Sequence, residues 1–459
     1  MLKNLVGDRA FYRNVMALAT PIIIQNGITH LVNMLDNIMI GSVGTVEMNG
    51  VTVANQLIFV FILCIFGAVS GAGIFTAQFS GNNDHEGVAH TMRFKLLFCL
   101  FLTAIGIGVF LLWDEPLINL YLQGEGNPAD AAASLKNAQE YLNIMLIGLV
   151  PHALVQCYSS TLREVGQSKP PMVAGVIAVL VNLVGNYVLI FGHFGAPRMG
   201  VAGAAVATVI SRFVELAVLV IWTHTHTEQN PFATILYRSL RIPLRLMGQI
   251  FMRGLPLLAN EAAWSTGMAT LNQQYSLLGL NVVGANNICH TFWNVFAVAF
   301  MAMGESVGIL LGQQLGSGDR EGAHRDSRKL IAFSVVVSVV FCILYIVCAP
   351  FIPFLYNTTP EIRALATSLM IVSALAMPVD AFAHASYFTL RSGGQAFITF
   401  MVDSCFMWVV NVSLAYVLVH FTSLPIVPVF AACQFINIIK CLLGGWLVHK
   451  GAWIKTIVE

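Results

Sequence analysis

Apolar stretches of roughly 20 or more residues recur along the whole chain, separated by short polar breaks. Such stretches are long enough to cross a membrane as α-helices, and lipid offers the backbone no other hydrogen-bond partner. The two-residue alternation of a transmembrane β-strand is absent. The pattern predicts an all-α membrane protein with about twelve transmembrane helices, near residues 14–41, 51–80, 88–113, 137–162, 168–192, 200–223, 249–278, 284–314, 328–350, 362–390, 394–421 and 425–448.

Composition strengthens this prediction. Of the 459 residues, 57% are hydrophobic and 10% are charged, whereas soluble domains carry about 25% charged residues. A net charge of +1 offers no basic stripe for nucleic acid. The nine cysteines lack zinc-site spacing, and the motifs of proteases, ATPases and dehydrogenases are absent. We therefore expect neither an enzyme nor a resident cofactor.

The placement of Lys and Arg predicts the orientation in the membrane. Eighteen of them lie at the termini and in the even-numbered loops, and only three (Lys136, Arg198 and Arg363) lie in the odd-numbered loops. Because cytoplasmic loops are enriched in Lys and Arg, both termini are expected in the cytoplasm, which requires an even number of helices. The first apolar run is too long for a signal peptide and is read as an uncleaved helix.

Short motifs recur in order between the two halves of the chain. The offset between matched residues is 235 near residue 80, 228 near residue 160 and 229 near residue 185. Six helices per half would give both halves the same orientation, as in parallel transporter repeats. We expect two pseudo-symmetric six-helix bundles around a central cavity, at residues 1–237 and 238–459. The matched pairs include Gln78/Gln313, Gly81/Gly316, Asp84/Asp319, Gly87/Gly322, Thr161/Thr389, Arg163/Arg391, Gln167/Gln395, Asn182/Asn411 and Tyr187/Tyr416.

A group of polar residues in the first half is a candidate ion site. Asp36 lies in the first predicted helix, Asn182 and Asn186 share one face of the fifth, and Thr208 lies early in the sixth. An acid at mid-membrane costs about 2.5–3.5 kcal/mol and so needs a reason. A carboxylate, two amides and a hydroxyl predict an oxygen site for Na⁺, or a cage for a titrating carboxyl. The alternative is that the amides and the hydroxyl only join helices.

The second half offers Glu261 and Asp380, each a few residues after a helix-bending proline. Glu305 and His384 are further possible residues of this site, although we favour a structural role for Glu305 and a hydrogen-bonded position in the helix core for His384. For Asp403, and for Glu215, which follows Arg212 by three residues, we favour a structural role. His152 is interpreted as a histidine of the helix core.

The ordered set of these residues resembles the multidrug and toxic compound extrusion (MATE) family, in its bacterial NorM/DinF-like branch. The resemblance covers nearly the whole chain and includes Asp36-Asn37-Ile38-Met39-Ile40-Gly41, Asn182-x₃-Asn186, Gly203-Ala-Ala-Val-Ala-Thr208, Gly254-Leu255-Pro256, and Asp380 followed by Arg391. It implies a monomeric, two-lobed antiporter of the bacterial inner membrane that exports organic cations in exchange for Na⁺ or H⁺. Asp36, Asn182, Asn186 and Thr208 would form the N-lobe cation site, and Glu261 and Asp380 the C-lobe site for a cation or the substrate.

Two other functions remain open on the sequence. A lipid-linked saccharide flippase of the same superfamily would need basic groups in mid-membrane to hold an anionic substrate, whereas the predicted membrane interior is mostly acidic. An intramembrane enzyme would need paired catalytic groups at a defined spacing, and none is visible. We therefore favour cation-driven export.

Overall fold

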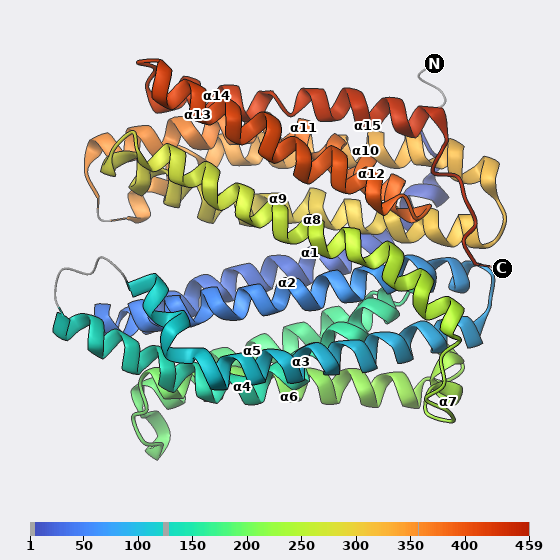
Figure 1. The fold of residues 1–459 in the computed structure, drawn as a ribbon, viewed down its shortest axis with the longest axis horizontal. Helices are drawn as coiled ribbons and strands as arrows, with labels where there is room; N and C mark the ends of the chain where they lie inside the picture. Colours follow the sequence, from blue (N-terminus) through green and yellow to red (C-terminus); the bar gives the residue numbers. More distant parts are fainter. Residues whose placement is uncertain (1–4, 123–127, 357, 459) are drawn as a thin grey trace. The chain divides into compact units, whose positions relative to one another are not determined.

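The computed structural model describes residues 5–122, 128–356 and 358–458, and no β-strand occurs in these ranges (Figure 1). The α-helices are α1 (Arg9–Gly41), α2 (Thr45–Gly81), α3 (His85–Leu122), α4 (Pro128–Glu164), α5 (Lys169–Phe191), α6 (Val201–Thr225), α7 (Phe232–Leu236), α8 (Leu244–Ser276), α9 (Leu280–Gly316), α10 (Arg320–Cys348), α11 (Pro360–Ser392), α12 (Ala396–Phe400), α13 (Ser413–Phe421), α14 (Ile426–Phe435) and α15 (Ile438–Lys450). Two short 3₁₀ helices cover His193–Gly195 and Ile352–Leu355, and π-helical turns cover Met401–Cys405 and Met407–Val412.

The described helices confirm the predicted membrane architecture. Eleven segments of the described chain are long and apolar enough to cross a membrane. Ala396–Phe421 and Ile426–Lys450 each count as one such span, although each contains two short helices. Helix α8 has 33 residues and coincides with the predicted span at 249–278, so the eleven segments and α8 together correspond to the twelve predicted spans. Helix α7 lies in the loop between the two halves of the chain.

The repeated Asp and Gly of the polar motifs form helix caps. Asp319 precedes α10, and its carboxylate accepts a hydrogen bond from the Gly322 amide at 2.9 Å. Asp84 precedes α3 and accepts from the Gly87 amide at 2.8 Å. An aspartate at this position satisfies an amide that the helix itself leaves unpaired. The motif therefore marks where the third and ninth spans of the described chain begin.

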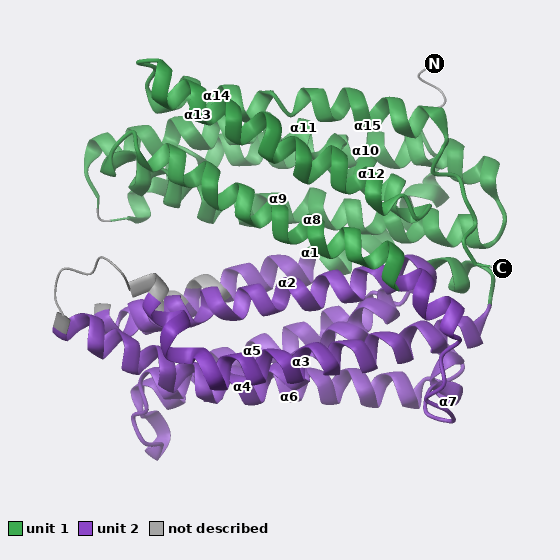
Figure 2. Cartoon of the chain, viewed as in Figure 1, with its two compact units in different colours: residues 1–23, 77–83, 251–459 green, residues 24–76, 84–250 purple. Residues whose placement is uncertain are grey.

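The chain forms two compact units (Figure 2). Unit 1 contains residues 1–23, 77–83 and 251–459, and unit 2 contains residues 24–76 and 84–250. The beginning of α1 and the end of α2 thus pack with the second half of the chain. In unit 2, α6 packs on both α4 and α5, and α3 packs on α4.

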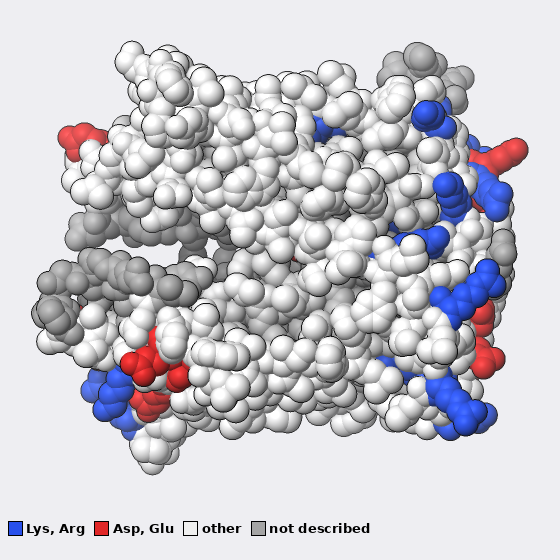
Figure 3. All heavy atoms as spheres, viewed as in Figure 1, with Lys and Arg blue, Asp and Glu red and all other residues white. Residues whose placement is uncertain are grey.

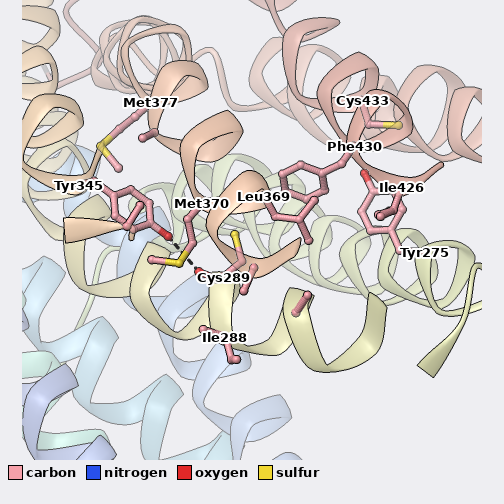
Figure 4. Close-up of a cluster of buried hydrophobic side chains, with 14 of the residues drawn as sticks. Tyr275, Ile288, Cys289, Tyr345, Leu369, Met370, Met377, Ile426, Phe430 and Cys433 are labelled. Atoms are coloured by element: carbon pink, nitrogen blue, oxygen red, sulfur yellow. Dashed lines mark hydrogen bonds between the residues drawn. The ribbon is translucent and has the colours of Figure 1, made fainter. Parts of the chain in front are cut away.

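The core of unit 1 is centred on α9 and α11, which pack extensively on each other (Figure 4). Phe430 and Cys433 of α14 pack against this core, as does Tyr345 of α10. The Tyr345 hydroxyl donates to the Cys289 carbonyl at 3.2 Å. This bond satisfies the one polar atom that the tyrosine carries into an apolar environment.

Two repeat glycines allow the ends of α2 and α9 to cross at backbone distance within unit 1. A Cβ atom at Gly81 would overlap the backbone of Gln313, and one at Gly316 would overlap the backbone of Gln78. The contact is reciprocal, because each helix offers a glycine to the other helix's main chain. Only glycine permits this approach, which explains why the Gln-x-x-Gly pattern occurs in both halves.

The last residues of the chain pack into the end of unit 1. Gln78 donates to the carbonyls of Ser392 at 2.9 Å and Lys455 at 3.1 Å, and accepts from the Ile457 amide at 2.8 Å. Trp453 is fully buried, and its indole nitrogen donates to the Val448 carbonyl at 3.1 Å. This tail is therefore part of the folded core, which the helix pattern alone did not indicate.

Replacing Trp453 by alanine should destabilise unit 1 by about 3–5 kcal/mol, because a large buried side chain is lost and a cavity remains. Trp446 provides a matched control, since its side chain is 58% exposed and Trp446→Ala should change stability by under about 1 kcal/mol. Denaturant unfolding of the purified protein measures both effects. Equal losses for the two variants would contradict the assignment of the tail to the core.

Candidate functional site

The four residues predicted as an ion site in the first half come together in unit 2. Asn186 of α5 donates to one carboxylate oxygen of Asp36 at 2.7 Å. Asn182, one turn earlier, lies between Asp36 and Thr208 of α6. The spacing of four residues puts both amides on one face of α5, and α5 packs closely on α6. The sequence therefore identified a set of residues that the fold joins.

The orientation of the Asn182 amide decides the chemistry of this site. With its nitrogen toward Asp36, Asn182 donates to the carboxylate oxygens at 3.0 and 3.2 Å and accepts from the Thr208 hydroxyl at 3.1 Å. With its oxygen toward Asp36, the amide nitrogen donates to Thr208 instead. In that orientation two acceptors face each other, which requires a cation or a proton between them. The oxygen and nitrogen of an amide are assigned from such networks, and the first orientation suits a site without a cation.

Asp36 has no ion-pair partner among the residues that the structure describes. Arg212 lies within electrostatic range of it, but its guanidinium pairs with Glu215 at 2.9 Å, and that glutamate is 5% exposed. The Arg212–Glu215 pair is the structural role predicted for Glu215. The side-chain oxygen of Asn186 is buried and accepts no hydrogen bond from the described residues. The Asp36 carboxylate thus lies next to an oxygen that these residues leave unused.

In unit 1, one of the acids, Asp403, forms an ion pair. Asp403, in the π-helical segment, pairs with Lys440 of α15 at 3.0 Å and accepts from the Asn260 amide at 3.2 Å. Ser404 donates to the Asn260 side-chain oxygen at 2.7 Å. The structure therefore gives Asp403 the structural role predicted for it, and it adds Asn260, which the sequence analysis did not single out.

Asp380 begins a chain of polar contacts. The Asn437 amide lies 3.5 Å from the Asp380 carboxylate, and Asn411 donates to the Asn437 oxygen at 3.1 Å. The Asn411 oxygen is buried without a partner. Asn437 was missed from the sequence, although the offset of 229 that matches Asn182 with Asn411 also matches Thr208 with Asn437.

The remaining candidates lie near aromatic side chains of unit 1. Arg391 and Asp403 lie within electrostatic range of Glu261, and Glu261 makes no contact with Asp380 in the described part of the chain. His384 lies within electrostatic range of Glu305 and stacks on Tyr387 at a centroid distance of 6.2 Å. Glu261, Glu305 and Asp380 are all partly buried.

His152 occupies the position in α4 that Asp380 occupies in α11, at the offset of 228 set by the motif Thr-Leu-Arg. It is buried, and its Nε2 atom has no partner in the described part of the chain. Each half thus has an asparagine that contacts a polar side chain, the Thr208 hydroxyl for Asn182 and the Asn437 amide for Asn411. The carboxylates next to these contacts, however, come from different helices. In unit 2 the acid comes from α1, and in unit 1 it comes from α11.

Comparisons with known proteins agree on one family. The MatE family model matches residues 21–188 and 256–417. The probable multidrug resistance protein NorM of Thermotoga maritima is 25% identical over 464 residues, which cover 97% of this chain and 94% of that protein.

Solved structures show the same fold. An outward-facing multidrug resistance MATE transporter of the MOP superfamily is 20% identical, covers 98% of both chains and has a TM-score of 0.85. A MOP superfamily transporter from Pyrococcus furiosus, described as having a binding pocket of reverse polarity, is 20% identical with a TM-score of 0.84, and covers 99% of this chain and 98% of its own. A mutant of the Vibrio cholerae transporter VcmN is 16% identical with a TM-score of 0.84, and covers 96% and 97%.

Replacing Lys440 by methionine should destabilise unit 1 by about 2–3 kcal/mol, because Asp403 would keep its charge without a partner. The loss should stay below the about 3–5 kcal/mol of a fully buried pair, since the Asp403 side chain is 27% exposed. The double variant Asp403→Asn/Lys440→Met should recover at least half of the loss, as measured by unfolding in denaturant. A double variant as unstable as the single one would exclude a structural ion pair.

Proposed function

The chain belongs to the MatE family, and we propose that it is a secondary active antiporter that exports organic cations across the cytoplasmic membrane in exchange for Na⁺. The observation that carries this proposal is the unpaired carboxylate of Asp36 among the amides of Asn182 and Asn186. A partly buried carboxylate without a basic partner attracts a cation or a proton. Alternating access would then couple the passage of two cations.

The donor set favours Na⁺ over H⁺ as the coupling ion. Two Asp36 oxygens, the Asn182 oxygen, the unused Asn186 oxygen and the Thr208 hydroxyl are all hard oxygen donors, and one negative charge matches one monovalent cation. A proton would need only one carboxylate oxygen. The neutral oxygens around Asp36 are therefore accounted for by a coordinated ion.

The Asn182 amide supplies a means of exchange. When Na⁺ arrives, the amide oxygen turns toward it and the nitrogen donates to Thr208. When Na⁺ leaves, the amide nitrogen turns back and donates to Asp36. The carboxylate is thus satisfied in both states, which keeps the release of the ion from leaving an isolated charge.

The organic cation is assigned to the acids of unit 1. Glu261, Glu305 and Asp380 are partly buried, and Tyr387 and Phe300 flank His384 among them. Aromatic rings next to carboxylates attract bulky cations through both charge and ring faces. Asp403 is not part of this assignment, because Lys440 already neutralises it.

Transport in proteoliposomes tests the proposal. An imposed Na⁺ gradient should drive efflux of a cationic dye, and each tenfold step in that gradient supplies about 1.4 kcal/mol per Na⁺. Asp36→Asn should lower Na⁺-driven efflux at least about tenfold, whereas Asp114→Asn, a variant of an acid paired with Gln139, should not. Efflux driven only by a pH gradient would mean that H⁺, not Na⁺, is the coupling ion. Movement of a lipid-linked saccharide without any transport of the dye would support a flippase instead.

Ion binding can be measured separately from transport. Na⁺ at about 100 times its Kd should stabilise the purified protein by about 2.7 kcal/mol by mass action. K⁺ at the same ionic strength is the control, and Asp36→Asn and Thr208→Val should reduce the Na⁺ effect. An undiminished Na⁺ effect in Asp36→Asn would place the ion elsewhere.

A further inference from the structure

A basic pocket opens at the end of unit 1 that carries the C-terminal tail. It has a volume of about 500 Å³ and lies between the start of α10 and the tail that follows α15; its lining residues are Arg320, Glu321, His324, Arg325, Arg328 and Ile454. Figure 3 shows that Lys and Arg side chains of unit 1 gather at this end. None of these residues belongs to the ion or substrate sites described above.

Two of the arginines in this pocket carry uncompensated charge. Neither Arg320 nor Arg328 has a carboxylate within ion-pair distance among the described residues. Within the described chain, the hydrogen-bond partners of the Arg328 guanidinium are histidine nitrogens, His324 at 3.0 Å and His449 at 3.2 Å. The Arg320 guanidinium forms a long hydrogen bond of 3.5 Å with the hydroxyl of Thr456. Guanidinium groups in this state are available for an external anion.

The other charged groups of the pocket do not cancel this excess. Arg325 lies 3.4 Å from Asp326, but Asp326 is already paired with Lys329 at 2.8 Å. The one lining carboxylate, Glu321, is exposed and forms no ion pair among the described residues. The Nδ1 atom of His324 is buried without a partner. The pocket therefore combines several donors with a single opposing charge.

The surroundings of the pocket indicate where the anion comes from. Below it, α15 exposes Ile439, Leu442 and Trp446, which lie on one face at spacings of three and four residues. Helix α10 likewise exposes a row of valine and isoleucine side chains, namely Val336, Val340, Ile343 and Val347. Lys450 lies 5.1 Å over the Trp446 ring, an arrangement typical of the membrane interface. The exposed apolar faces of α10 and α15 thus extend along the two helices from the end that carries the basic pocket.

We propose that this pocket binds a phosphate group, presented by the headgroup of an anionic phospholipid whose acyl chains lie against α10 and α15. Arg320 and Arg328 would hold the phosphate oxygens, and His324 would donate a further hydrogen bond. Basic pockets between helices at the cytoplasmic surface suit this chemistry. The site does not depend on the transport function proposed above, because it shares no residue with the ion site in unit 2.

Thermal stabilisation of the purified full-length protein at low salt tests this proposal. Short-chain phosphatidylglycerol should raise the melting temperature at lower concentration than short-chain phosphatidylcholine does. Arg320→Gln/Arg328→Gln should weaken phosphatidylglycerol binding at least about tenfold, because two attractive charges are lost. The matched control Arg238→Gln/Arg241→Gln removes two exposed arginines outside the pocket and should leave binding unchanged.

A variant that is expected to tighten lipid binding distinguishes a specific effect from misfolding, because misfolding would only weaken binding. Glu321→Gln removes the only carboxylate that lines the pocket, and it should tighten phosphatidylglycerol binding a few-fold. The single variant Arg320→Gln changes an exposed side chain and should weaken binding without loss of fold. Equal responses to the two lipids, or unchanged binding in the Arg320 variants, would overturn the proposal. If inorganic phosphate raised the melting temperature as strongly as phosphatidylglycerol does, the pocket would bind a soluble anion, and the proposal of a lipid headgroup would be overturned.

Discussion

Lipid offers a charged side chain no partner, so the protein must satisfy every charge that it places within the membrane. Most of these charges form internal pairs, such as Arg212–Glu215 and Lys440–Asp403. Lys95 and Glu164 form another pair, which is almost fully buried in unit 2. Asp36 and Asp380 differ, because amides rather than a base contact their carboxylates. The acids therefore fall into two groups, those paired with a base and those contacted by amides, and the proposed cation sites use acids without a base at ion-pair distance.

The two units share a hydrogen-bonded contact between repeat-related residues but differ in the charged residues around it. Asn182 contacts Thr208 at 3.1 Å, and the equivalent Asn411 contacts Asn437 at the same distance. The acid next to each contact comes from a different helix, and His152 stands where unit 1 has its aspartate. A basic Lys440 is added only in unit 1. The backbone repeat is therefore preserved while the charge pattern is not.

The lengths of the apolar runs sufficed to predict about twelve helices. The grouping of Asp36, Asn182 and Thr208 was predicted instead from polar residues inside apolar spans and from the family resemblance, because periodicity does not determine which helices pack together. The apolar pattern did not indicate the packing of the C-terminal tail, since the burial of Trp453 depends on tertiary contacts and has no period. Asn437 was missed for a different reason. Its partner in the repeat is a threonine, so the two residues share a position and a hydrogen bond but not an identity.

The π-helical turns between α12 and α13 coincide with a change in the repeat. The offset between the halves grows from 228 at Gln395 to 229 at Asn411, so this segment has gained one residue relative to α5. In a regular α-helix such an insertion would rotate everything after it by about 100°. A wide turn absorbs the extra residue locally. Asn411 therefore keeps its hydrogen bond to Asn437 although this segment is one residue longer than its counterpart in the first half.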